Sequence, residues 1–257
     1  MSNKSQKIFT GAAVALTTLF TDDLEVDYEA TAKHAQHLVS AGIPAVVVCG
    51  TSAEPETLSD DERLGLLDAV LDAVGQTPVI MGASLPSARQ SGAFAALVNQ
   101  RKVAAVIARS PRGLADPIPF YNHVAESIGD TPLLAYHFPA AAPPGIPVDA
   151  LAKSPVVGVK DSSGDVERLL ATLDAFDGDV YVGSPILLLL AGQLGCAGGI
   201  LQVANAFPEL CLEAFAGQAK AQRELFTFHT RSKADFPRGI KELMAQRSGT
   251  SLATRLA

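Results

Sequence analysis

The sequence predicts an α/β protein built as a (β/α)8 barrel. Eight short apolar runs alternate with segments of helical patterning over about 215 residues. Several runs are almost uniformly apolar, as in Ala45-Val46-Val47-Val48, which is typical of parallel strands covered on both faces. A doubly wound open sheet is the alternative fold, but the chain contains no Gly-x-Gly-x-x-Gly motif.

The eight apolar runs have the length and the β-branched content of strands. The strands are expected at residues 10–16, 45–49, 78–83, 104–108, 132–138, 156–160, 180–183 and 199–203.

The segments between these runs are expected to form helices. Gly42 follows the first helix as a C-terminal cap. Ser59 opens the second, with Glu62 three residues later at the spacing of a capping box. The helices are expected at residues 28–41, from Ser59 onward, at 87–102, 117–128, 166–176 and 185–194, and after Phe207, with a short Pro-rich link at 147–153.

The end of the chain predicts two further helices outside the barrel. We divide the chain into a catalytic barrel at residues 1–217 and a C-terminal helical extension at residues 218–257. Low-complexity segments and long linkers are missing from the sequence, so the extension is expected to pack on the barrel.

Composition and charge exclude several classes of protein. The 257 residues are 48% hydrophobic, which excludes a disordered chain, and the formal net charge is −7, without the basic stripe of a nucleic-acid binder. Cys49, Cys196 and Cys211 are scattered, so neither a disulfide framework nor a zinc site is expected. We expect small buried thiols in a cytoplasmic protein.

The N-terminus resembles a short export signal. Lys4 and Lys7 precede an apolar stretch at residues 8–20, but a small-residue cleavage site does not follow it. We therefore expect this stretch to contain a buried first strand. Since the apolar stretches all fall short of a membrane span, binding to a membrane is not expected.

Lys160 is the most informative single residue. In a barrel, catalytic groups lie where the strands end, and Lys160 ends the run Pro155-Val156-Val157-Gly158-Val159. Alternation places Lys160 on the same face as Gly158 and places Asp161 on the other face. If that face is the interior, partial desolvation favours the neutral amine, a nucleophile, and Gly158 leaves room for a substrate. The alternative is a lysine that extends from the strand end to solvent.

Two other strand ends carry polar groups that suit an attacking amine. Tyr136 ends the fifth strand and offers a proton donor and acceptor, although it could also be a core tyrosine with a satisfied hydroxyl. Thr51 and Ser52 follow the second strand and Gly50, and they could hold a carboxylate or simply form a turn.

The histidines give weaker signals. His34 and His37 are spaced as neighbours on one helix face, without a third ligand, so we expect a solvated pair rather than a metal site. His137 alternates away from Tyr136, and we expect it to be packed or to cap a turn.

The strand ends together resemble those of the dihydrodipicolinate synthase/N-acetylneuraminate lyase family of Schiff-base enzymes. The resemblance covers residues 8 to 257 in order and spacing. The matching segments are Gly50-Thr51-Ser52-Ala53-Glu54, similar to a Gly-Thr-Thr-Gly-Glu motif; Tyr136-His137-Phe138-Pro139, similar to Tyr-Asn-x-Pro; Gly158-Val159-Lys160-Asp161-Ser162-Ser163-Gly164-Asp165, similar to the Schiff-base lysine motif; and Gly195-Cys196-Ala197-Gly198-Gly199-Ile200.

This resemblance implies a mechanism. Lys160 would form an imine with the keto carbon of pyruvate or another 2-keto acid, and Tyr136 would shuttle protons. Thr51 and Ser52 would hold the carboxylate, and Thr51 would also orient Tyr136. Ile200 would contact the keto acid through its backbone. The imine acts as the electron sink, so the resemblance implies no metal and no organic cofactor.

Gly183 and Arg112 complete the expected substrate site. Gly183 ends the seventh strand, and Arg112, or Arg109 beside it, is expected to bind an acidic or hydroxylated tail. The partners expected are therefore a 2-keto acid and an aldehyde, in a homo-oligomer.

The chain also departs from the family's synthases. Ser110-Pro111-Arg112 stands where they carry a pair of tyrosines, and Ala140-Ala141-Ala142 stands where they carry an arginine. His137 replaces the motif's asparagine. These changes leave the imine chemistry intact and alter the second-substrate site.

We therefore predict a cofactor-independent class I aldolase that splits a 2-keto-3-deoxy sugar acid into pyruvate and an aldehyde. The alternative within the family is dihydrodipicolinate synthase or a related hydratase-type lyase. A non-catalytic barrel that binds keto acids is the alternative from another class.

Overall fold

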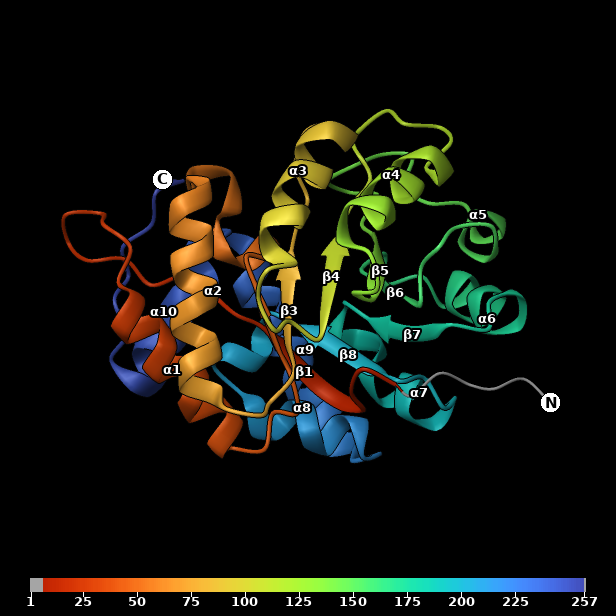
Figure 1. The fold of residues 1–257 in the computed structure, drawn as a ribbon. Helices are drawn as coiled ribbons and strands as arrows, with labels where there is room; N and C mark the ends of the chain where they lie inside the picture. Colours follow the sequence, from red (N-terminus) through yellow and green to blue (C-terminus); the bar gives the residue numbers. More distant parts are fainter. Residues whose placement is uncertain (1–6, 257) are drawn as a thin grey trace.

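A computed structural model describes residues 7–256. Eight strands form one closed barrel in the order β1 to β8, and every neighbouring pair is parallel. Helices alternate with the strands and surround them (Figure 1). The predicted (β/α)8 barrel is therefore confirmed, and the open sheet is excluded because β8 pairs with β1.

Each predicted strand is present, with ends that shift by one or two residues because pairing stops where the loops begin. The strands are β1 (Gly11–Ala15), β2 (Val46–Val48), β3 (Val79–Gly82), β4 (Ala105–Ala108), β5 (Leu133–His137), β6 (Gly158–Asp161), β7 (Asp179–Val182) and β8 (Gly198–Leu201).

The predicted helices are also present. Two differ at an end by three or more residues: residues 99–102 form a turn after Asn99 caps the third helix, and Pro185 starts a short 3₁₀ turn instead of an α-helix. The stretch at 147–153, expected as a Pro-rich link, contains a short helix, Val148–Ala152, which Pro147 precedes. The helices around the barrel are α1 (Tyr28–Ser40), α2 (Asp60–Val74), α3 (Ala88–Val98), α4 (Ile118–Ile128), α5 (Val148–Ala152), α6 (Val166–Ala175), α7 (Leu188–Gln193) and α8 (Pro208–Phe215), with 3₁₀ turns η1 (Thr51–Ala53), η2 (Pro55–Thr57), η3 (Pro185–Leu187) and η4 (Val203–Asn205).

Local sequence signals act as expected at the helix ends. The hydroxyl of Ser59 accepts from the backbone N–H of Glu62, and the Glu62 carboxylate accepts from the Ser59 N–H, which is the predicted capping box. Gly42 follows the cap of α1 with a φ of 101°, a left-handed conformation that favours glycine.

Two further helices follow the barrel, α9 (Ala219–Ala234) and α10 (Arg238–Ser248). They pack against each other and against α8 and η4. In Figure 1 the end of the chain lies beside α2, on the opposite side of the barrel from α5 and α6. The division at residue 217 stays a prediction, since α8 and α9 pack together closely.

The apolar stretch near the N-terminus contains a buried barrel strand. Val14 of β1 is fully buried and pairs with Val46 on one side and Leu201 on the other. Lys4 lies outside the described residues. Among residues 7–256, the helices are all too short or too polar to cross a membrane.

The core has two layers, because successive side chains on a strand point to opposite faces. Ala12 and Val14 of β1 belong to the layer under the helices, whereas Ala13 and Ala15 belong to the interior of the barrel. Phe9 stacks on Tyr181 at 4.5 Å between ring centroids and fills the amino-terminal end of the barrel. The carboxyl-terminal end of the barrel is therefore the end available for an active site.

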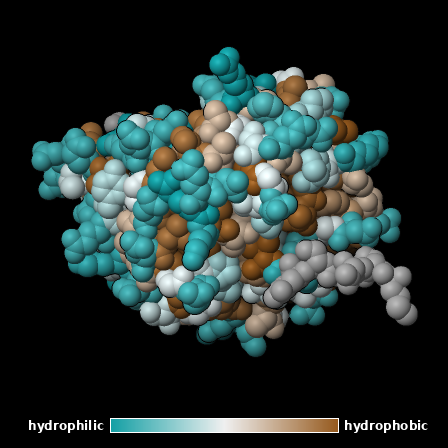
Figure 2. Space-filling view, viewed as in Figure 1, coloured by the Kyte–Doolittle hydropathy of each residue, from teal (hydrophilic) through white to brown (hydrophobic). Residues whose placement is uncertain are grey.

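The outer surface carries polar side chains among separate hydrophobic patches (Figure 2). His37 is exposed on α1, as predicted. The expectation of a solvated histidine pair is wrong for His34, which is buried against the barrel; burial lowers its pKa to about 4. The apolar pattern of α1 is compatible with His34 on the buried or the exposed face of the helix, and the packing of α1 on the barrel places it on the buried face.

Candidate active site

A cavity of about 700 Å³ opens at the carboxyl ends of the strands. Its walls come from the ends of β2, β3, β4, β5 and β6 and from the loops that follow them. Lys160, Tyr136, Thr51 and Arg112, which the sequence singled out, all line it. The cavity thus lies where barrel enzymes carry their active sites.

Lys160 and Tyr136 are neighbours across the barrel wall. Their Cα atoms are partners in the pairing of β5 with β6, so both side chains point to the same face, the barrel interior. The Lys160 Nζ lies 4.4 Å from the centroid of the Tyr136 ring, and the two residues are 5% and 6% exposed. Of the two alternatives that the sequence left open for Lys160, the structure shows the inward one.

Asp161 does not neutralise the Lys160 ammonium. One oxygen of its carboxylate pairs with Arg168 Nε at 2.8 Å, and the other accepts from the backbone and the hydroxyl of Ser163. This matches the alternation expected from the sequence. The expectation that Gly158 leaves room for substrate is wrong, because an added Cβ would lie 2.6 Å from the Asp179 carbonyl oxygen and 2.9 Å from Leu134.

Thr51 contacts the Tyr136 hydroxyl from the turn that follows β2. Its Oγ1 lies 3.4 Å from the Tyr136 hydroxyl, although 85 positions separate the two residues. Cys49 and Glu54, on either side of this turn, have φ values of 54° and 55°, which are uncommon outside glycine. The loop thus holds Thr51 in place with a backbone that needs support from its surroundings.

The surroundings of Tyr136 lower the pKa of its phenol. Burial raises the pKa of the phenol, but the ammonium of Lys160 and the hydroxyls of Thr51 and Ser162 outweigh burial, so the pKa falls below its usual value of 10.

Cys49 lines the same cavity as an inert thiol, since burial raises its pKa to about 12.

Ser162 is a site residue that the sequence reasoning missed. It interacts with the Tyr136 hydroxyl, and its Oγ lies 1.9 Å from where a Cβ on Gly183 would be. Strand alternation was the available signal, because Ser162 lies two residues after Lys160 and so shares its face. Gly183 makes room for Ser162 and for Lys160, whose Cε would lie 3.0 Å from that Cβ.

Three of the expected substrate-binding residues lie outside the cavity lining. Ser52 is buried in η1 beside Thr51. Ile200 is fully buried in the barrel interior, where it pairs with Ala13. Gly183 lies next to Lys160. Their roles in binding stay predictions.

The rim of the cavity is cationic. Arg63, Arg109 and Arg112 line the cavity above Lys160, and among the described residues Glu56 gives its lining a single carboxylate. Arg63 already pairs with Asp60 at 2.8 Å and donates to the Pro55 carbonyl. Within the described part of the chain, the Arg109 and Arg112 guanidinium groups form neither hydrogen bonds nor ion pairs, so both are free to meet a ligand.

The loops after β4 and β5 close one side of the cavity. The N–H of Gly113 donates to the Pro143 carbonyl at 2.7 Å and joins the two loops. His137 is buried and points away from the cavity, where its Nδ1 accepts from the Ile146 N–H at 2.9 Å. As predicted, it fixes a loop, and that loop presents Ala141 and Ala142 to the cavity.

Comparison with known proteins identifies the family. The model of the dihydrodipicolinate synthetase family matches residues 8–251. The chain belongs to this family. Its members are class I, pyruvate-dependent lyases that make or break carbon–carbon bonds, and the lysine–tyrosine pair of the barrel has the residues that this chemistry requires.

Relatives of known sequence or structure agree with this assignment. A 4-hydroxy-tetrahydrodipicolinate synthase of Staphylococcus carnosus is 34% identical over 217 residues, which cover 79% of this chain and 72% of the relative. A prophage protein of E. coli K12, solved with pyruvate, has a TM-score of 0.88 at 22% identity, covering 96% of this chain and 92% of that one. A 2-keto-3-deoxygluconate aldolase variant of Sulfolobus solfataricus has a TM-score of 0.83 at 22% identity, covering 95% and 87%. The two structural likenesses concern the fold.

Proposed function

We propose that this lyase cleaves a 2-keto-3-deoxy sugar acid to pyruvate and an aldehyde. The observation that carries the proposal is a buried lysine beside a tyrosine, at the base of a cavity with a hydroxyl-rich and cationic rim. At about 700 Å³ the cavity exceeds what pyruvate alone fills, and its remaining volume suits a hydroxylated tail.

In the proposed reaction the Lys160 amine attacks the keto carbon. One proton passes from the nitrogen to the oxygen and Tyr136 gives a second, so the oxygen leaves as water, and a protonated imine and the Tyr136 phenolate remain. The phenolate then takes the proton of the C4 hydroxyl, the C3–C4 bond breaks and the aldehyde is released. The bonding electrons move into the imine as an enamine, which Tyr136 protonates at C3, and water hydrolyses the resulting imine to pyruvate and the free Lys160 amine.

The carboxylate of the keto acid is assigned to the Thr51 loop. The Thr51 hydroxyl lines the cavity within reach of Tyr136, so a carboxylate there would hold the keto carbon near Lys160. We assign supporting roles to Ser52 and to the backbone of Ile200, as the family resemblance implies, and to Gly183 at the end of β7.

The tail of the substrate is assigned to the rim. Arg109 and Arg112 offer donors without partners among the described residues, and the hydroxyls of Ser84 and Ser110 lie on the same side of the cavity. Such a lining favours hydroxyl and carboxylate groups over an apolar tail.

Borohydride reduction in the presence of pyruvate, followed by intact mass, tests the imine. A stable adduct on Lys160 is expected, whereas its absence would support a non-catalytic barrel. A panel of 2-keto-3-deoxy sugar acids, assayed for pyruvate release, then tests the substrate class, with an equal concentration of heat-denatured enzyme as the control.

The second candidate is a dihydrodipicolinate synthase, which the name of the S. carnosus relative favours. We expect this chain to condense pyruvate with aspartate semialdehyde at least tenfold more slowly than a known synthase does at equal concentration. Ala140-Ala141-Ala142 supplies no donor side chain for the second carboxylate, and such a contact contributes about 1.5–3 kcal/mol. An assay coupled to a dihydrodipicolinate reductase measures it. A rate within about tenfold of the synthase would make the second candidate the better one and would leave the role of Lys160 unchanged.

Chelators are expected to leave the lyase activity unchanged. The protonated imine accepts the electron pair, so the proposed chemistry needs no Lewis acid. The measurement is pyruvate release after dialysis against EDTA, with and without added Zn²⁺ or Mg²⁺. Activity that EDTA removes and a divalent metal restores would indicate a metal-dependent aldolase instead.

A cytoplasmic location and a homo-oligomeric state complete the proposal. The three cysteines are free and buried in the structure, which suits a reducing compartment.

A further inference from the structure

Glu54 lies in a buried polar cluster outside the cavity. Its carboxylate pairs with Lys241 of α10 at 2.6 Å, and both side chains are fully buried. The Lys241 ammonium also donates to the Ala253 carbonyl at 2.5 Å and lies 4.5 Å from the centroid of the Phe20 ring. Burial lowers the pKa of Lys241, and the Glu54 carboxylate opposes this shift.

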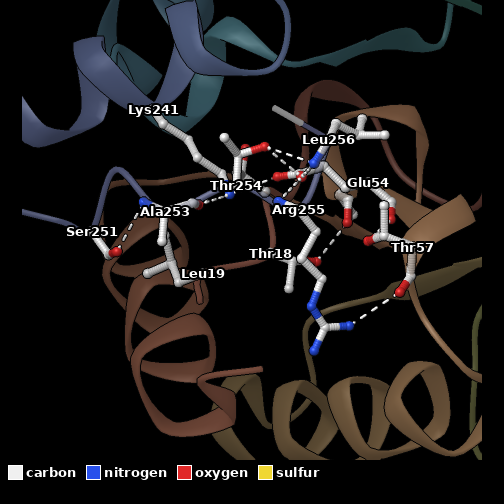
Figure 3. Close-up of polar contacts among 12 residues, drawn as sticks. Thr18, Leu19, Glu54, Thr57, Lys241, Ser251, Ala253, Thr254, Arg255 and Leu256 are labelled. Atoms are coloured by element: carbon white, nitrogen blue, oxygen red, sulfur yellow. Dashed lines mark hydrogen bonds and ion pairs between the residues drawn. The ribbon is translucent and has the colours of Figure 1, made fainter. Parts of the chain in front are cut away.

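The end of the chain wraps around the same carboxylate (Figure 3). Glu54 Oε2 accepts from the Thr254 hydroxyl at 2.7 Å and from the N–H groups of Arg255 and Leu256 at 2.8 and 3.2 Å. These partners lie about 200 positions away along the chain. The segment 253–256, here called the tail, thus closes on Glu54 from one side while α10 closes from another.

The tail is also held to the loop on the far side of Glu54. The Arg255 guanidinium donates to the Thr57 carbonyl at 3.1 Å and to the Glu62 carboxylate at 2.8 Å. Among the described residues, those that line the cavity all lie at or before position 160, so the tail does not touch it. The tail instead contacts Glu54, Thr57 and Glu62, which lie behind the wall of the cavity.

Glu54 directly ends the turn that carries Thr51. It caps η1 in a left-handed conformation, and the Thr18 hydroxyl donates to the carbonyl of Ala53 at 2.9 Å. A buried ion pair is a poor source of stability, because desolvation of both charges offsets their attraction. What such a pair does provide is one fixed geometry, since any other leaves a buried charge unpaired.

We propose that Glu54, Lys241 and Thr254 are positioning residues that hold the Thr51 loop for binding of the keto-acid carboxylate. The proposal rests on the function proposed above. It implies that the last turn of the chain controls the affinity for pyruvate from outside the cavity, and, by linkage, that pyruvate bound at Lys160 tightens the tail.

The test compares T254V with T250V. Both remove a buried threonine hydroxyl from the same region, but that of Thr250 has no hydrogen-bond partner. Borohydride trapping is measured against pyruvate concentration, together with Tm. We expect half-saturation to rise about three- to tenfold in T254V, to change less than about twofold in T250V, and to return to the wild-type value in T254S. Trapping at saturating pyruvate is expected to stay the same in all of them.

Equal half-saturation in T254V and T250V, or a T254V effect confined to Tm, would overturn the proposal. If the wild type itself is not trapped, the proposed function fails and this inference fails with it. Should T254V not fold, hydrogen exchange of the wild type decides: slower exchange in peptides covering residues 251–256 after pyruvate trapping is expected, and unchanged exchange would overturn the proposal.

Discussion

Replacing Lys160 with alanine is expected to abolish covalent trapping of pyruvate and, with it, lyase turnover. Among residues 7–256, Lys160 supplies the only amine in the cavity lining. It is 5% exposed and stands beside Tyr136 rather than beside a neutralising carboxylate. Without it, the electron sink cannot form, and the residual rate should fall to the background of the assay.

The fold should tolerate this change. Lys160→Ala removes a buried charge that lacks a carboxylate partner, so Tm is expected to stay within a few degrees of the wild type or to rise. K153A is the matched control, because Lys153 is exposed and, among the described residues, its ion pair is with Asp149 on the helix surface. An adduct on the Lys160→Ala variant at wild-type yield would remove Lys160 from the mechanism, provided the Tm values agree.

Replacing Tyr136 with phenylalanine is expected to slow turnover by about 10²–10⁴, the usual contribution of a general acid–base group. The ring that packs beside Lys160 is retained, so pyruvate should still be trapped at saturation, although more slowly. The lost hydroxyl is the one that contacts Thr51 at 3.4 Å. The measurement is kcat for pyruvate release, with trapping as the check on binding.

The pH dependence of imine formation distinguishes a proton-transfer role of Tyr136 from a purely structural one. Because Lys160, Thr51 and Ser162 lower the pKa of Tyr136, the phenol loses its proton below pH 10. The deprotonated phenol cannot donate a proton, so the rate of imine formation should fall on the alkaline side at a pH below 10. This alkaline fall should disappear in the Tyr136→Phe variant, which has no phenol to titrate.

Tyr121→Phe is the control for the tyrosine variant. Tyr121 is also fully buried, but its hydroxyl donates to the Ala108 carbonyl and does not line the cavity. Its loss should cost about 0.5–1.5 kcal/mol of stability and leave turnover near wild type. A Tyr136→Phe variant within threefold of the Tyr121→Phe control would show that Tyr136 is no proton carrier.

The sequence alone predicted most of the fold. Each strand was visible as a short apolar run, because a parallel strand covered on both faces has few positions for a polar side chain. The alternation along β6 correctly placed Lys160 and Asp161 on opposite faces, since this depends only on a period of two. The capping box at Ser59 and Glu62 is equally local.

Burial on helices was less predictable. His34 belongs to a helix with two possible faces for it, and only the packing of α1 on the barrel decided that it lies inside. Similarly, the expected space at Gly158 is filled by the Asp179 backbone and by Leu134, both of which come from neighbouring strands. The sequence around Gly158 does not show which groups of the neighbouring strands fill the space beside it.

The sequence by itself determined the barrel, the opposite faces of Lys160 and Asp161 and the family motifs, because each depends on spacing within a few residues. It left open whether Lys160 points inward or to solvent, and the closed barrel decided this. The tertiary structure shows the contact of Thr51 with Tyr136 that the family resemblance implied. Only the tertiary structure placed Ser162 over Gly183 and joined Glu54 to Lys241 and to Thr254. These contacts form when β8 closes on β1 and the last helices fold back. In the sequence Glu54 ends a segment that resembles a family motif, and Lys241 looks like an ordinary surface charge. That the two are buried against each other follows from which elements cover them in the closed chain.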